Sequence, residues 1–245
     1  MTFRIKQALP SLIGVVVLIL IGAWVLHVAD LSWFKDHHSD TRDALFEHIR
    51  LTLTTMAISL AIAVPLGTLV ARVPILYTPI VGLLGMIYTI PSLALFAILV
   101  TYVGIGFRVA IIALVAYTQF ILVRNVIVGL RQVDPFAIEA ARGMGMNSWQ
   151  ILFKIEYPLA LPTILGGVRI ATVATIAISS IAFLIDAGGL GQLLFDGINN
   201  SLFNTSELQV GAIAVSLLAL CADLLLRIVE WTLPASRARA AAARQ

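Results

Sequence analysis

Charged residues are scarce in this chain: 12% of its 245 residues are Asp, Glu, Lys or Arg, whereas 60% are hydrophobic. A soluble domain needs a larger polar surface than this composition provides. Long apolar stretches cross a bilayer as helices, because helices satisfy their own backbone hydrogen bonds. The composition therefore predicts an all-α integral membrane protein. The single cysteine, Cys221, excludes an internal disulfide.

Sequence signatures of catalysis and metal binding are missing as well. The chain contains neither a G-x-x-x-x-G-K-S/T phosphate loop nor an H-E-x-x-H metal helix. His37, His38 and Asp40 lie in one short segment without further spaced ligands, which is a weak basis for a metal site. We therefore expect no catalytic residue, no cofactor and no metal on this chain.

Membrane spans are expected wherever about 20 consecutive residues are mostly apolar. Six such stretches are present, at about 9–29, 52–71, 79–103, 109–128, 163–185 and 208–226. The stretch 73–107 carries no formal charge over 35 residues and as one straight helix would measure about 52 Å. Pro74 and Pro79 are expected to delay the start of this helix, and Gly104 and Gly106 to end it, which leaves one span.

The first stretch, 9–29, follows Arg4 and Lys6 and shares that charge pattern with a signal peptide. Its apolar run is long for a signal peptide, and no small-x-small cleavage site follows it. An uncleaved spanning helix is therefore favoured.

The distribution of basic residues predicts the topology. With both termini in the cytoplasm, twelve Lys and Arg residues fall inside (Arg4, Lys6, Arg72, Arg124, Arg131, Arg142, Lys154, Arg169, Arg227, Arg237, Arg239 and Arg244) and four outside (Lys35, Arg42, Arg50 and Arg108). This split follows the positive-inside rule. Because the basic residues are scattered along loops, a pI near 9.3 does not indicate a nucleic-acid partner.

One polar segment inside this apolar chain predicts a cytoplasmic helix–turn–helix. Asp134 is a good N-cap with Pro135 at the first helical position, and Gly145 is a candidate for the positive-φ residue after the helix. Asn147 and Gln150 match a second capping arrangement, whose short helix Pro158 is expected to close. Such a segment suits docking of a soluble partner; the alternative is an amphipathic helix on the membrane surface.

The same segment resembles a known family. Glu139-Ala140-Ala141, Gly145, Ile155 and Pro158 have the spacing of the cytoplasmic E-A-A loop in permease subunits of binding-protein-dependent ABC importers, with Tyr157 where Leu is usual. In that family the loop forms a coupling helix that sits in a groove of the ATPase subunit. The resemblance implies that these six residues dock the ATPase, with Ala140 and Ala141 leaving a bare face and Glu139 supplying a charge.

Further segments resemble permeases for glycine betaine, choline and carnitine. They are 90–95, 122–125, 142–146, 158–162 and 187–191, and the resemblance covers about 48–200. It implies two ATPase subunits that hold ATP and Mg, a second permease copy or paralogue, an extracytoplasmic binding protein, and residence in the inner membrane of a prokaryote. Where this chain has Asp186, the family often has Gly.

The expected architecture is a type I importer core of five helices preceded by one N-terminal helix. The N-terminal helix and an external linker take 1–46, the permease domain takes 47–230, and a cytoplasmic tail takes 231–245. The segment 30–47 is polar and is read as the linker.

Several residues are candidates for the translocation path or its outer gate. Pro91 is expected to kink its span beside Ser92, and Gly188, Gly189 and Gly191 permit a tight reversal. Each set is open to a plain reading as a packing kink or a turn. Aromatic rings that attract quaternary ammonium groups, or only pack, lie in the same spans: Tyr88, Phe96, Tyr102, Tyr117 and Phe120.

Charged residues at membrane depth are too few for a proton relay. Asp223 and Arg227 are expected to pair on one helix face, and Arg169 to reach the inner surface. This favours energy supplied by ATP on a partner. The alternatives are a permease for methionine or another small polar nutrient, a passive osmotically gated channel, and a membrane anchor or scaffold.

Overall fold

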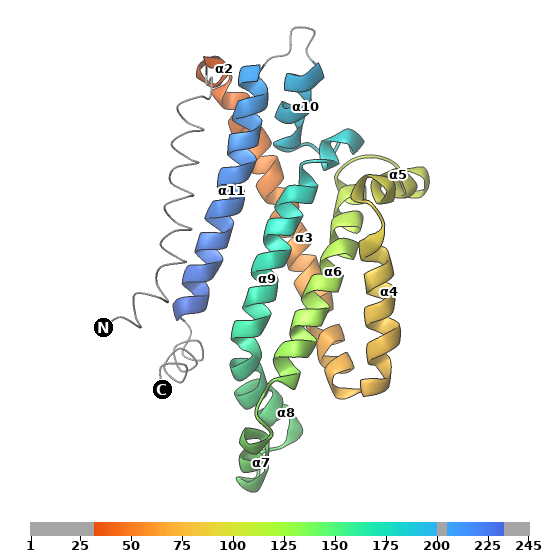
Figure 1. Ribbon diagram of the computed structural model, residues 1–245, viewed down its shortest axis with the longest axis vertical. Coiled ribbons are helices and arrows are strands. Elements are labelled where there is room, and N and C mark those ends of the chain that lie inside the picture. Colours follow the sequence, from red (N-terminus) through yellow and green to blue (C-terminus); the bar gives the residue numbers. More distant parts are fainter. Residues whose placement is uncertain (1–31, 200–204, 233–245) are drawn as a thin grey trace, which may run out of the picture.

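The computed structural model describes residues 32–199 and 205–232, and in these ranges all regular structure is helical. Four long helices run side by side: α3 (His38–Arg72), α6 (Phe107–Arg131), α9 (Tyr157–Ser179) and α11 (Thr205–Thr232) (Figure 1). Helix α6 is the centre of the bundle, because α3, α9, α4 and α5 all pack against it. The all-α prediction is confirmed for the described part of the chain.

Glycine allows the central helices to approach closely. A Cβ on Gly67 of α3 would lie 2.7 Å from the Cβ of Val126 in α6. A Cβ on Gly167 of α9 would lie 2.4 Å from the Cβ of Asn125, also in α6. Both distances are far inside van der Waals contact, so no other residue fits without moving a helix. The buried apolar residues of the same region include Met56, Leu122, Ile127, Ile164 and Ala171.

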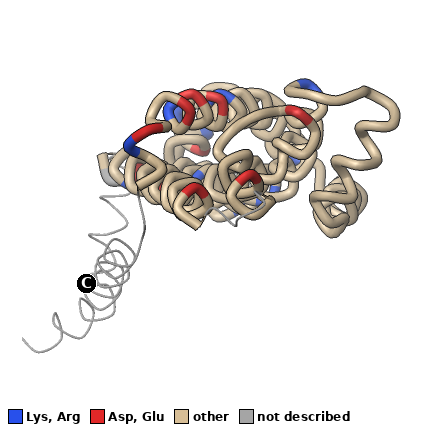
Figure 2. Tube along the Cα trace, turned by 90° about the horizontal axis from the view of Figure 1, so that it is seen from above, with Lys and Arg blue, Asp and Glu red and all other residues tan. Residues whose placement is uncertain are grey.

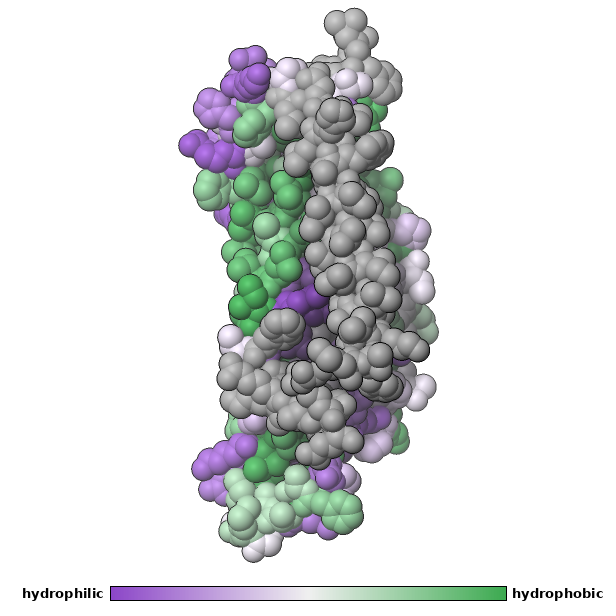
Figure 3. Space-filling view, turned by 60° about the vertical axis from the view of Figure 1, so that its left-hand side comes forward, coloured by the Kyte–Doolittle hydropathy of each residue, from purple (hydrophilic) through white to green (hydrophobic). Residues whose placement is uncertain are grey.

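Four helices are long and apolar enough to cross a membrane, and a bent helix pair makes a fifth span when it is counted as one. Three of the expected spans, 52–71, 109–128 and 208–226, lie within α3, α6 and α11. The expected first span at 9–29 lies outside the described residues, so the total of six stays a prediction. Figure 3 shows hydrophobic side chains along the middle of one face, hydrophilic ones toward its two ends, and one hydrophilic patch at mid-height.

The expected single span over 79–103 is wrong in shape. The chain forms α4 (Tyr77–Thr89) and α5 (Ser92–Val103), which are bent by 96° at the break between them. Ile90 is extended with ψ 129°, and Pro91 has no N–H with which to continue the helix, so the predicted kink is a complete break. Pro74 opens a short 3-10 turn ahead of α4, and Gly104, with φ 93°, ends α5 as expected.

The prediction that Pro158 closes a short helix is also wrong. Helix α8 (Ser148–Ile151) runs through a π-helix, η2 (Leu152–Glu156), into α9 without interruption. The N–H of Tyr157 bonds the carbonyl of Leu152 in the wider π turn, and Pro158 follows directly after this turn, inside the continuous helix. The expected span 163–185 therefore starts earlier, and it ends at Ser179, before a short 3-10 helix, η3 (Ala182–Ile185).

The expected external linker is largely helical. Helix α2 (Ser32–Asp36) leads directly into α3, which begins at His38. The ring of His37 stacks on Trp33 at 4.3 Å. Figure 2 looks down the bundle from this end and shows Asp and Glu residues on several of the helices that meet here. Five carboxylates line a cavity of ≈250 Å³ between α3, α10 (Gly191–Asn199) and α11: Asp40, Asp43, Glu47, Asp196 and Glu207.

Candidate functional site

The E-A-A segment forms α7 (Pro135–Gly143) at the end of the bundle opposite α2 and α10 (Figure 1). The Asp134 carboxylate accepts the Phe136 N–H at 2.9 Å, and Pro135 stands at the first helical position. Both predicted features of this helix start are confirmed. The cap satisfies a backbone donor that the first turn leaves without a partner.

The turn after α7 is also built as the sequence predicts. Gly145 has φ 81°, and the Met146 N–H bonds the Ala141 carbonyl at 3.1 Å, which closes the helix in a Schellman arrangement. Asn147 and Gln150 then form a reciprocal capping box, with both side-chain-to-backbone distances at 2.9 Å. The hydrogen bonds of the turn are thus met within the segment, so its shape does not depend on a partner.

One face of α7 is exposed along its whole length. Its members recur at i, i+3, i+4, i+7 and i+8: Phe136, Glu139, Ala140, Gly143 and Met144. We call this set the α7 stripe. Phe136 and Met144 are 79% and 74% exposed, which is unusual for side chains of this size outside an interface. Ala141 is fully buried, which corrects the expectation that both alanines lie on the bare face.

The residues after the loop tie this segment to the spans. Glu156 forms an ion pair with Arg72, at the end of α3, with 2.5 Å between the carboxylate and the guanidinium. The hydroxyl of Tyr157 forms a hydrogen bond with that of Thr68 at 2.7 Å. The Leu that is usual at this position could not form this bond. Ile155 is partly buried and Pro158 is exposed. Ile155 lies in η2 and Pro158 in the first turn of α9, outside α7, and their part in docking stays a prediction.

The predicted glycine turn lies at the opposite end of the bundle. Gly188 and Gly189 have φ 73° and 97°, so the turn needs residues without a Cβ. Gly191 stands where a Cβ would lie 1.9 Å from the Ser180 carbonyl oxygen. Asp186 has φ 60° and ψ 35°, a left-handed conformation that Gly adopts without strain and in which Asp is tolerated.

Two neighbouring residues of α3 hold this turn. The Glu47 carboxylate accepts the Gly189 N–H at 2.9 Å, and Nδ1 of His48 accepts the Leu190 N–H at 3.3 Å. Nε2 of His48 lies 3.0 Å from the Ile176 carbonyl of α9, so it is the nitrogen that carries the proton. We call this arrangement the Glu47–His48 clamp. Sequence reasoning missed it because its partners are 142 residues apart.

The break at Pro91 collects three of the five aromatic candidates. Tyr88 stacks on Phe120 with ring centroids 5.0 Å apart, and Tyr117 meets Tyr88 edge-on at 6.0 Å. Phe96, 1% exposed, belongs to the buried core, and Tyr102, 83% exposed, lies away from the cluster. Pro91 is exposed and Ser92 is partly buried at the start of α5.

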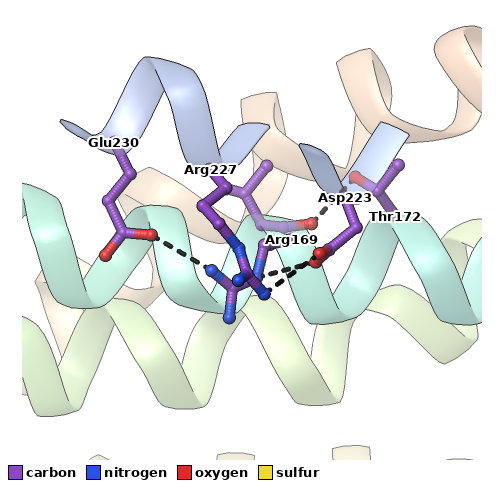
Figure 4. Close-up of polar contacts among 6 residues, drawn as sticks. Arg169, Thr172, Asp223, Arg227 and Glu230 are labelled. Atoms are coloured by element: carbon purple, nitrogen blue, oxygen red, sulfur yellow. Dashed lines mark hydrogen bonds and ion pairs between the residues drawn. The ribbon is translucent and has the colours of Figure 1, made fainter. Parts of the chain in front are cut away.

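An ion network joins α9 to α11 within two of the candidate spans (Figure 4). Arg169 contacts Asp223 at 2.9 Å and Glu230 at 3.3 Å, and the expected pair of Asp223 and Arg227 is present at 3.3 Å. Arg169 was expected to reach the inner surface by itself; instead its charge is balanced by carboxylates of the neighbouring helix. The network is neutral overall, which lowers its cost in an apolar setting.

Sequence reasoning did not single out six residues of these sites. For Phe136, Gly143 and Met144 a signal was present, because their i, i+7, i+8 spacing marks a single helix face. Glu47, His48 and Arg72 offered none, because their partners come from other helices.

The sequence is similar to transport proteins of known families. Residues 63–232 match the family described as "Binding-protein-dependent transport system inner membrane component". The chain is 35% identical over 205 residues to the carnitine transport permease protein OpuCB of Listeria monocytogenes, covering 84% of this chain and 93% of the relative. It is 39% identical over 205 residues to the osmoprotectant import permease protein OsmW of Salmonella typhimurium, covering 82% and 94%.

Solved structures agree with this assignment. An inward-facing structure of the MetNI methionine ABC transporter matches with a TM-score of 0.62 and 26% identity, over 75% of this chain and 93% of that one. An amino acid ABC transporter matches with a TM-score of 0.68 over 84% and 100%, and at 18% identity it supports the fold alone. The chain therefore belongs to the inner membrane components of binding-protein-dependent transport systems, as an ABC importer permease of the osmoprotectant family.

Proposed function

We propose that this permease moves osmoprotectants such as glycine betaine, choline or carnitine into the cell, and that it docks a separate ATPase through the α7 stripe. Two ATPase subunits, which bind ATP and Mg, would act on a pair of permeases, either two copies of this chain or this chain with a paralogue. An extracytoplasmic binding protein would deliver the solute. Both termini would lie in the cytoplasm.

The exposed α7 stripe is the observation that carries the docking proposal. It combines two large apolar side chains, one carboxylate and two residues with almost no side chain. Low residues beside large anchors suit close approach of a second protein, and anchors of this kind dominate binding energy. The alternative, a helix on the membrane surface, has to account for a carboxylate on the same face as the apolar side chains.

The substrate class rests on the relatives. The two relatives described above are a carnitine transport permease and an osmoprotectant import permease, and both matches cover more than four fifths of this chain. The α4–α5 segment carries no formal charge between positions 73 and 106. A zwitterionic or cationic solute therefore meets no repelling charge there.

Charge reversal at Glu139 tests the docking surface. Glu139→Arg is expected to abolish recovery of the ATPase when the tagged chain is purified in mild detergent, and to abolish ATP-dependent uptake in proteoliposomes. The control is Asp43→Arg, a reversal of charge at an exposed carboxylate near the start of α3, whose ion pair is with the exposed neighbouring Arg42. Full assembly and uptake with Glu139→Arg would refute the proposal.

A permease for methionine is the second candidate, because a methionine transporter is among the solved structures that match. Uptake assays with labelled glycine betaine, choline, carnitine and methionine separate the two. Transport of methionine alone would replace the proposed substrate class and leave the docking surface unaffected.

A further inference from the structure

The break between α4 and α5 places aromatic rings where the helix backbone is interrupted. The hydroxyl of Tyr117 donates a hydrogen bond to the carbonyl of Ile90, the extended residue of the break. Tyr117 in turn contacts Tyr88, which stacks on Phe120 with an interplanar angle of 28°. The orientation of this aromatic cluster is therefore fixed by the break itself.

The electrostatics of this position favour a cation. The faces of aromatic rings carry negative charge density, and the carbonyl end of α4 adds the negative end of a half-helix. Interrupted helices within the membrane supply solute sites in many transporters for this reason. With no ionised side chain between positions 73 and 106, the attraction stays weak, as passage requires.

The rings of the cluster differ in exposure. Tyr117 is 5% exposed, whereas Tyr88 is 40% exposed. The buried hydroxyl-bonded ring holds the cluster, and the exposed ring offers a surface. Phe96, by contrast, is 1% exposed and offers no ring face.

From these observations we infer that Tyr88 and Phe120, positioned by Tyr117, form a transit site for the quaternary ammonium group of the transported solute. The inference rests on the proposed osmoprotectant substrate class and goes beyond it by assigning a solute contact to the permease. The cavity beneath the cluster, between Tyr88, Thr118 and Thr175, measures ≈10 Å³ and has room for about one water. The ammonium group therefore binds against the exposed side of Tyr88 and not inside this cavity.

Saturation-transfer NMR on the full permease–ATPase complex in nanodiscs, without binding protein, measures this contact directly. The probes are glycine betaine, choline and 3,3-dimethyl-1-butanol, in which carbon replaces the charged nitrogen of choline. We expect saturation of the N-methyl protons of the two ammonium compounds and a clearly weaker signal for the neutral tert-butyl group. Equal signals for choline and its neutral isostere would overturn a cation site.

Variants assign the contact to the cluster. Tyr88→Leu and Phe120→Leu are expected to lower the affinity for the ammonium probes by about two- to thirty-fold, the range of a cation–π contact. Tyr88→Phe keeps the ring and is expected to bind normally, which separates ring loss from misfolding. Tyr102→Leu is the matched control from the same segment, because that ring lies outside the cluster.

Uptake by the complete assembly in proteoliposomes separates this inference from the function on which it rests. We expect Tyr88→Leu to lower the maximal rate with little change in KM, since the binding protein sets the apparent affinity. Unchanged binding and uptake in Tyr88→Leu would overturn the transit site alone. Failure of the unaltered assembly to take up glycine betaine, choline or carnitine would refute the substrate class.

Discussion

The carboxylate of Glu47 in α3 accepts the backbone N–H of Gly189 at 2.9 Å, so the glycine turn is attached to a helix 142 residues earlier in the chain. The same carboxylate also lies close to the residue before Gly189. A Cβ on the neighbouring Gly188 would lie 2.2 Å from the same carboxylate oxygen. Glycine is therefore required there by contact as well as by its backbone conformation.

Gly188→Ala is expected to destabilise the protein more than Gly145→Ala. Both glycines have positive φ, 73° and 81°, which costs an alanine about 1–2 kcal/mol. A Cβ on Gly145 meets nothing within 4 Å, whereas one on Gly188 displaces Glu47 and breaks a charged hydrogen bond worth about 1.5–3 kcal/mol. Thermal unfolding of the purified variants in detergent measures the difference, and equal shifts would contradict it.

His48→Leu is expected to lower the free energy of unfolding by about 1–3 kcal/mol. The His48 ring is fully buried, and its loss leaves the Leu190 N–H without this partner, whereas the Ile176 carbonyl still accepts the Ser180 hydroxyl at 3.5 Å. His38→Leu, at an exposed position, is the control. Unfolding of both variants under one set of conditions tests this, and a His48 variant as stable as its control would refute the clamp.

Adjacent glycines of α9 are expected to respond in opposite directions to alanine. A Cβ on Gly166 meets nothing within 4 Å, so Gly166→Ala is expected to raise stability by about 0.5–1 kcal/mol through its higher helix propensity. A Cβ on Gly167 would overlap Asn125, and Gly167→Ala is expected to lower stability by about 1–3 kcal/mol. The melting temperatures of the two variants, each compared with that of the unaltered protein, test this prediction. Shifts of the same sign would contradict the packing described.

Arg169→Leu is expected to cost more stability than Arg227→Leu. Arg169 balances two carboxylates of α11, and its loss leaves Glu230 without this partner and Asp223 with Arg227 alone, for about 1–3 kcal/mol in this partly buried setting. Arg227 joins a residue of its own helix, a contact worth about 0.3–0.5 kcal/mol. Unfolding at low and high salt measures both effects, and the reverse order would show that α11 is held by apolar packing.

Features set by neighbouring residues could be predicted from the sequence. Asp134, Gly145 and the pair Asn147–Gln150 act through hydrogen bonds within a few positions, and the structure confirms all of them. The pair Asp223–Arg227 was likewise visible as an i, i+4 spacing. Local chemistry was therefore sufficient for the shape of the docking segment.

Features that depend on contacts between helices could not be predicted. Whether a proline ends, bends or enters a helix depends on its surroundings, so Pro91 and Pro158 were both misjudged, in opposite directions. Ala141 is buried where α7 packs against α8 and η2, which helical spacing alone did not reveal. The partners of Glu47 and Arg169 lie on other helices, and a sequence without contacts does not indicate them.

The continuous helix from Ser148 to Ser179 has a mechanical consequence. Its 32 residues form a rod about 48 Å long, with the capping box beside α7 at one end and Ile176, which His48 holds, near the other. Between these ends, Gly167 lies so close to Asn125 of α6 that a Cβ would not fit. One continuous helix therefore connects the α7 segment at one end of the bundle with the turn that Glu47 and His48 hold at the other.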